Sequence, residues 1–314
     1  MSKKYKNNLE FKKSAMGEFV SIDENEYSVF VTGHGEDTLI FMAGEGVPSP
    51  ILDFKPLWSL LEDKFKIVVL EKAGYGWSDV TNKNRDIGTL VSDNQKMLKV
   101  LNIAAPYILV AHSYSGLEAV YWAQNYKDEI KAIISLDMTL PVMVNFISIP
   151  TITKLAFVLF SMFPNVNIGH KRATKLIKKL PSFNLLESED KETYLNVLMH
   201  RFMTKNMINE IKMMVDNAKY IENKEHPKNT PILFFSSNLI DAAKSAKMSV
   251  DELLQLHKNF VAKFFKAKHI QLDCDHFVHA YFPKKIEEEI KIFISEINSQ
   301  IRPNSIKSLA NILL

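Results

Sequence analysis

The chain has 314 residues, a length that suits one large α/β domain with an insertion or two small domains. With 46% hydrophobic and 24% charged residues, its composition is that of an ordinary globular protein. The net charge of +3 comes from 39 basic and 36 acidic residues, and the scattered lysines argue against a nucleic-acid-binding surface.

The single cysteine, Cys274, means that no internal disulfide can form and that no thiolate cluster can bind metal. Residues 1–13 are rich in lysine, but no apolar run follows them, so they do not resemble a signal peptide. Pro150 and Lys154 interrupt the longest apolar stretch, 142–163, which favours two short buried or lid helices over a membrane span. We therefore expect a cytoplasmic protein, with membrane contact through this stretch as the alternative.

Strand and helix patterns alternate along most of the chain, which is typical of a mostly parallel sheet covered by helices on both faces. Residues 26–32 and 38–42 are predicted to form a hairpin around the turn at 33–37. Further strands are predicted at 65–70, 107–111, 132–136, 231–235 and 269–272, with helices at 54–62, 90–101, 117–126, 250–265 and 286–297.

Between residues 138 and 229 the strand patterns stop, and helical patterns broken by prolines take their place. This stretch is too long for a simple connection, so we interpret 138–229 as a helical cap inserted into a core formed by 1–137 and 230–314. Its Met and Phe side chains recur at helical spacing, as they do in an ordinary core, and methionine is also common on adaptable binding surfaces. A cap of this kind favours a partly apolar substrate.

The strand predicted at 107–111 runs almost directly into a helix through Ser113. A turn this tight strains its central residue and needs small neighbours two positions away, here Ala111 and Ser115. It lifts the serine hydroxyl above the sheet edge and aims the first helical N–H groups at the atom under attack. The pattern predicts that Ser113 is a nucleophile; a serine that only caps the helix is the alternative.

A serine nucleophile needs a base, and His276 follows the last predicted strand in a short loop before a helix, where the base of such a site belongs. His279, one helical turn later, is expected to be structural or pocket-lining. His112 is expected to pack under the serine turn, and His34 lies in the predicted hairpin turn, away from the strand ends.

Two aspartates are candidates for the acid that orients the histidine. Asp137 directly follows the strand at 132–136, and Asp241 lies later in the loop after 231–235. Asp137 is favoured because it lies at a strand tip.

The oxyanion formed by serine attack needs two N–H donors. One is predicted to be the backbone amide of Tyr114, directly after the nucleophile. The second is assigned to the amide of Glu45, in the turn after 38–42, where Gly44 and Gly46 let the backbone approach a substrate closely.

With these residues in this order, the chain resembles the α/β-hydrolase superfamily over nearly its full length. The motifs that carry the resemblance are 41–46 (FMAGEG), 71–79 (EKAGYGWSD), 111–116 (AHSYSG) and 275–279 (DHFVH). The resemblance implies an α/β-hydrolase fold with a helical cap after the sixth strand. The chain departs from the family pattern at Ala43, where a histidine is usual, and at Ala111, Ser115 and Asp275, where glycines are usual.

We therefore expect a serine hydrolase that cleaves a carboxylic ester, or an amide or thioester, of a small, partly apolar substrate, without cofactor or metal. The resemblance also implies that a serine at this position disfavours dehalogenase and epoxide-hydrolase chemistry, which in this superfamily uses an aspartate there. The sequence predicts no oligomeric state.

Two other functions stay open at this point. The altered oxyanion turn is the only support for a ligand-binding protein without turnover. An aminopeptidase-type hydrolase could bind an amine through Glu187, Glu189 and Asp190, although these carboxylates fit a solvated helix start better.

Overall fold

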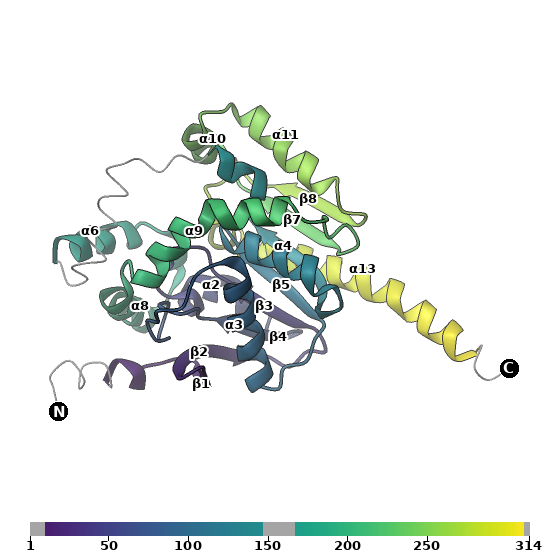
Figure 1. The fold of residues 1–314 in the computed structure, drawn as a ribbon. Helices are drawn as coiled ribbons and strands as arrows, with labels where there is room; N and C mark the ends of the chain where they lie inside the picture. The colour runs from purple at the N-terminus through teal and green to yellow at the C-terminus, as the bar shows by residue number, and fades with distance from the viewer. Residues whose placement is uncertain (1–9, 147–166, 311–314) are drawn as a thin grey trace.

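The computed structural model describes residues 10–146 and 167–310, and within them eight strands form one sheet (Figure 1). The strands lie in the order β1-β2-β4-β3-β5-β6-β7-β8. β1 pairs antiparallel with β2, and β2 with β4, whereas all the other neighbours are parallel. The predicted fold class is confirmed. The strands are β1 (Glu18–Ile22), β2 (Asn25–Thr32), β3 (Thr38–Met42), β4 (Lys66–Leu70), β5 (Tyr107–His112), β6 (Ile130–Leu136), β7 (Ile232–Ser236) and β8 (Ala267–Gln271).

Helices cover both faces of the sheet, so the inner strands are apolar at successive positions, which point to opposite faces. In β3, Ile40 and Met42 enter one core, beneath α3, α4 and α11. Leu39 and Phe41 enter the other core, beneath α2 and α13. These helices are α2 (Pro50–Trp58), α3 (Ile87–Val100), α4 (Ser115–Asn125), α11 (Val250–Val261) and α13 (Pro283–Ala310); shorter elements are η1 (Lys127–Glu129), α10 (Ile240–Ala246) and α12 (Val278–Tyr281).

The predicted hairpin between 26–32 and 38–42 is wrong. β2 pairs with β1 and β4, and β3 lies between β4 and β5, so β4 separates the two strands. The prediction missed β1, a short strand joined to β2 by Asp23 and Glu24, both at positive φ. The glycine-rich turn at 33–37 serves close packing, because a side chain at Gly33 would meet the backbone of Phe65.

Two helices also differ from their predicted ranges. α2 begins at Pro50 rather than at 54, because proline fits the first turn of a helix. α13 begins at Pro283 and continues to Ala310, well beyond the predicted 286–297. The other helices and strands lie within a few residues of the predicted ranges.

Between β6 and β7 the described residues form helices and no strand, as the predicted cap requires; the extent of this cap as a unit stays a prediction. α9 packs against α4 and η2, and α7 packs against α2 and α12. Residues 147–163 of the predicted apolar helices lie outside the described residues. Within residues 10–146 and 167–310, no helix combines the length and apolar character needed to cross a bilayer. The cap helices are η2 (Pro141–Asn145), α6 (Asn167–Ile177), α7 (Pro181–Leu185), α8 (Ser188–Arg201) and α9 (Lys205–Glu222).

Candidate active site

Ser113 lies in the tight turn between β5 and α4, where its backbone has φ of +56°. This left-handed conformation is uncommon for a residue with a side chain and marks a constrained turn. The hydroxyl of Ser115 stabilises the turn, because its oxygen lies within hydrogen-bond distance of two carbonyl acceptors, those of Met42 (2.6 Å) and His112 (2.8 Å). Serine at 115 is therefore small enough for the turn and also ties it to β3.

The loop after β3 lies directly against Ser113. A Cβ built on Gly44 would lie 2.6 Å from the Cβ of Ser113 and 3.2 Å from its Oγ, so only glycine fits there. The predicted oxyanion donor Glu45 follows, and Gly46 has φ of +76° with open space around it. One carboxylate oxygen of Glu45 is buried without a hydrogen-bond partner among the described residues, and burial raises the pKa of this side chain.

His276 and Asp137 form a hydrogen-bonded pair, with Nδ1 2.7 Å from Oδ2. The other carboxylate oxygen of Asp137 accepts from the backbone N–H of Ser237 at 2.8 Å, which fixes the orientation of the carboxylate. Burial alone would lower the pKa of His276, but the hydrogen bond and charge of Asp137 raise it overall. Burial likewise opposes ionisation of Asp137, yet the contact with His276 lowers its pKa.

The second aspartate, Asp241, lies in α10 and is exposed at the rim of the same pocket. Within the described residues it makes no hydrogen bond to His276. Of the two predicted acids, only Asp137 contacts the histidine, because β6 lies between β5 and β7 and its tip faces both loops.

Ser113, Asp137 and His276 open onto one pocket of about 290 Å³. Apolar side chains make up much of its wall: Met138, Met143, Leu239 and Ala242. The site can therefore hold a small, partly apolar molecule against the serine.

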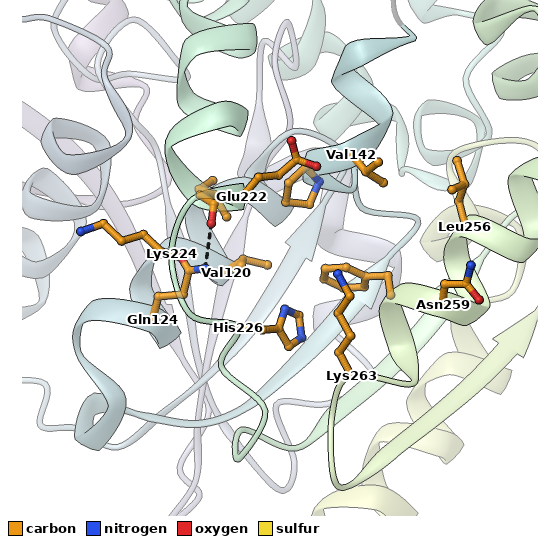
Figure 2. Close-up of a pocket in the computed structure, with 12 residues that line it drawn as sticks. Val120, Gln124, Val142, Glu222, Lys224, His226, Leu256, Asn259 and Lys263 are labelled. Carbon is orange, nitrogen blue, oxygen red and sulfur yellow. Dashed lines mark hydrogen bonds between the residues drawn. The ribbon is translucent and has the colours of Figure 1, made fainter.

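A second pocket of about 250 Å³ lies beside α4, and Figure 2 shows residues that line it. It contains none of the predicted catalytic residues. Burial lowers the pKa of His226, which lines it, to about 4. The other walls come from α4, α9, α11 and the residues just after α11, among them Val120, Gln124, Glu222, Leu256, Asn259 and Lys263.

A buried ionic cluster, which the sequence analysis did not predict, lies between α9 of the cap and the core. Glu210 of α9 accepts hydrogen bonds from Lys72 (2.9 Å), the Tyr75 hydroxyl (2.8 Å) and Nη2 of Arg85 (2.8 Å). Lys72 also donates to Glu118 at 2.8 Å. Lys72 and Tyr75 belong to the motif at 71–79, but their acidic partner Glu210 lies far away in the sequence, so the motif does not predict it.

The same cap helix holds the residue after the nucleophile. Tyr114 is fully buried, and its hydroxyl accepts from the side-chain amide of Asn217 at 2.6 Å. The acidic residues at the start of α8 are not part of the pocket, and Asp190 pairs with Lys55 at 2.6 Å. Among the residues that the structure describes, no group of His, Cys, Asp or Glu side chains could hold a metal ion.

A mostly parallel eight-stranded sheet with a serine on a strained strand-to-helix turn and an Asp–His pair at neighbouring strand ends defines an α/β hydrolase. The family model for the alpha/beta hydrolase fold matches residues 52–176. The uncharacterized protein YbdG of Bacillus subtilis (strain 168) is 32% identical over 273 residues, which cover 86% of this chain and 83% of that protein. The chain therefore belongs to the α/β-hydrolase superfamily.

Solved structures agree on the fold. ALR0039, a putative alpha/beta hydrolase from Nostoc sp. PCC 7120, superposes with a TM-score of 0.67 at 16% identity, covering 90% of this chain and 99% of that one. The epoxide hydrolase VrEH1 from Vigna radiata gives a TM-score of 0.65 at 17% identity, covering 91% and 99%. At these identities the likeness concerns the fold alone.

Proposed function

We propose that the chain is a serine hydrolase that cleaves a carboxylic ester of a small, partly apolar substrate through an acyl-enzyme. One observation carries the proposal: the Asp137–His276 pair, joined at 2.7 Å, opens onto the same pocket as Ser113 in its strained turn. A serine, a histidine and a buried carboxylate in this arrangement are the parts that activate a hydroxyl for attack on a carbonyl.

In the proposed reaction, His276 takes the proton of the Ser113 hydroxyl while the oxygen attacks the carbonyl carbon of the ester. The carbonyl oxygen becomes an oxyanion held by the backbone N–H groups of Tyr114 and Glu45. His276 then gives its proton to the departing alcohol, which leaves an acyl group on Ser113. A water molecule, activated by the same histidine, hydrolyses this acyl-enzyme and releases the carboxylic acid. Asp137 keeps the imidazole in the required tautomer and stabilises its charged form.

This chemistry needs no metal or organic cofactor. The close approach of Gly44 to Ser113 supports the oxyanion assignment, because it brings the backbone at 44–46 beside the nucleophile although Ala43 replaces the usual histidine. We also propose a cytoplasmic location, which fits a chain with a single, buried cysteine.

An epoxide hydrolase is among the structures with the same fold, but the serine at the nucleophile position favours ester cleavage here. Ester cleavage through a serine forms an acyl-enzyme intermediate, which water then hydrolyses. The residue at the turn is Ser113, so an acyl-enzyme is the intermediate that this site can form.

Labelling with a fluorophosphonate probe tests the proposal, because such probes modify an activated serine without requiring the true substrate. We expect the wild-type protein to label at Ser113 and the S113A and H276A variants not to label. Ser245→Ala is the matched control, since Ser245 lines the same pocket without touching the pair. If the folded wild-type protein does not label, a ligand-binding protein becomes the better interpretation of this fold. If it labels, a panel of esters is tested next as substrates.

A further inference from the structure

A second carboxylate–imidazole pair is buried behind the catalytic histidine. Asp53 of α2 is 0% exposed, and its Oδ2 lies 3.2 Å from Nε2 of His279 in α12. Its Oδ1 accepts from the hydroxyl of Ser182 in the cap helix α7 at 2.7 Å. One carboxylate thus joins the core, the segment after the catalytic histidine and the cap.

The surroundings of His279 indicate which ring nitrogen donates to Asp53. Nδ1 of His279 is buried and has no hydrogen-bond partner among the described residues. The ring packs against Phe54, with centroids 5.0 Å apart, and against His112 at 4.8 Å. A proton on Nδ1 would leave a buried N–H without an acceptor, which is costly. The proton on Nε2 instead is donated to the Asp53 carboxylate.

His112 connects this pair to the catalytic histidine. Its ring lies 4.7 Å from that of His276 and 4.8 Å from that of His279. Nε2 of His112 donates to the backbone carbonyl of His276 at 3.4 Å. Burial and the two neighbouring imidazoles hold the pKa of His112 well below its usual range, so the ring is neutral and transmits position rather than charge.

We propose that Asp53 is a positioning residue for the hydrolase reaction: it anchors the His276 loop through His279, ties that loop to the cap through Ser182, and supplies a second negative charge behind the catalytic imidazole. The inference rests on the proposed serine-hydrolase function. It assigns a functional role to a carboxylate that touches neither the substrate pocket nor the nucleophile.

The charge of Asp53 acts on His276 together with the other groups that face this imidazole. Asp137 is bonded to it, Glu45 and Asp53 are the other negative charges that raise its pKa, and the neutral ring of His112 lies beside it. The base works only when unprotonated, so the rate of serine modification rises with pH through the titration of His276. Removing the Asp53 charge destabilises the protonated form of His276 and lowers its pKa. The acid limb of the rate profile then moves to lower pH.

The test compares the rate of fluorophosphonate labelling against pH in the wild type and three variants. We expect Asp53→Asn to shift the acid limb to lower pH and to slow the plateau rate roughly fivefold, the effect of losing one hydrogen bond. An asparagine has one acceptor oxygen where the aspartate has two, so only one of the two donors, His279 Nε2 or the Ser182 hydroxyl, keeps its hydrogen bond. Ser182→Ala removes the tie to the cap but keeps the Asp53 charge, so its acid limb coincides with that of the wild type.

Asp93→Asn is the matched control, because Asp93 is also buried and bonded, to Tyr27 at 3.1 Å and to Lys83 at 2.8 Å, in another part of the core. Its profile is expected to match that of the wild type. A folded D53N protein whose acid limb coincides with the wild-type limb overturns the inference, whatever its plateau rate. Absence of labelling in the wild type itself overturns the proposed function instead, so the two failures are distinct.

A substitution of Asp53 that prevents folding leaves a second comparison at His279. His279→Leu removes the donor to Asp53, whereas His279→Gln can still supply one. We expect labelling to slow roughly fivefold in the Leu variant and to be largely restored in the Gln variant. Equal rates in the two folded variants would contradict the positioning role.

Discussion

Replacing Asp137 by asparagine is the sharpest test of the catalytic assignment, because the structure dictates how the amide must orient. The backbone N–H of Ser237 donates to Oδ1 of Asp137 at 2.8 Å, so the oxygen of an asparagine stays on that side. Its NH₂ group then faces Nδ1 of His276, where an acceptor had been at 2.7 Å. The histidine is forced to accept at Nδ1 and to carry its proton on Nε2, so it can no longer take the proton of Ser113.

The expected loss in kcat is about 10⁴-fold, the size seen when this exchange imposes the wrong tautomer in a serine protease. At about 1.4 kcal/mol per factor of ten, the loss corresponds to about 5 kcal/mol of transition-state stabilisation. Such a value exceeds what one lost hydrogen bond would cost, about 1 kcal/mol, so the tautomer effect is separable from simple loosening of the site.

The assay is the rate of ester turnover, or of fluorophosphonate labelling, at the plateau of the pH profile. Asp241→Asn serves as the matched control, because Asp241 lines the same pocket and is exposed. We expect its rate to stay close to that of the wild type. Retention of activity within tenfold in D137N, or a larger loss in D241N, would refute the assignment of the acid.

Three further predictions concern packing, the ionic cluster and the thiol. Gly44→Ala places a Cβ 2.6 Å from that of Ser113, so we expect a folded protein by circular dichroism whose labelling rate falls roughly a hundredfold; an unchanged rate would contradict the close approach. Glu210→Gln breaks the buried cluster and should lower the free energy of unfolding, measured in urea, by about 3–5 kcal/mol, whereas Asp190→Asn, at a single part-buried pair, should cost only about 1 kcal/mol. Burial raises the pKa of Cys274 to about 12, so its reaction with a disulfide reagent at pH 8 should be roughly a hundredfold slower in the folded protein than in urea; similar rates would show that the thiol is open to solvent.

The sequence was most informative about the candidate site residues that lie between a strand and a helix that are neighbours in the chain. Ser113 and His276 each follow a strand and precede a helix, and such a strand-turn-helix pattern is visible within a dozen residues. The strand tip also favoured Asp137 over Asp241, and the structure brings Asp137 to the histidine. Local patterns succeed here because parallel strands present their carboxyl ends at one edge, so their loops meet without further information.

Local sequence patterns did not show which distant segments pair with one another. The predicted hairpin failed because β4, which follows β3 in sequence, inserts between β2 and β3. Asp53 and Glu210 escaped notice for the same reason: each is one acidic residue in an amphipathic helix, and its partners lie more than a hundred residues away, at His279 and at Lys72. The burial of such a residue depends on which helices pack together, which a single sequence does not specify.

These two carboxylates connect the cap helices to two parts of the candidate site. Through α9, Asn217 bonds to the hydroxyl of Tyr114, and Glu210 accepts hydrogen bonds from Lys72 and Arg85. Through α7, Ser182 bonds to Asp53, which contacts His279 in the segment that follows His276. Catalytic groups must be held to within a fraction of an ångström by the residues around them. A cap that shapes the pocket and also fixes both parts of the site would couple substrate selection to the geometry of attack, so cap substitutions at these contacts should change kcat as well as KM.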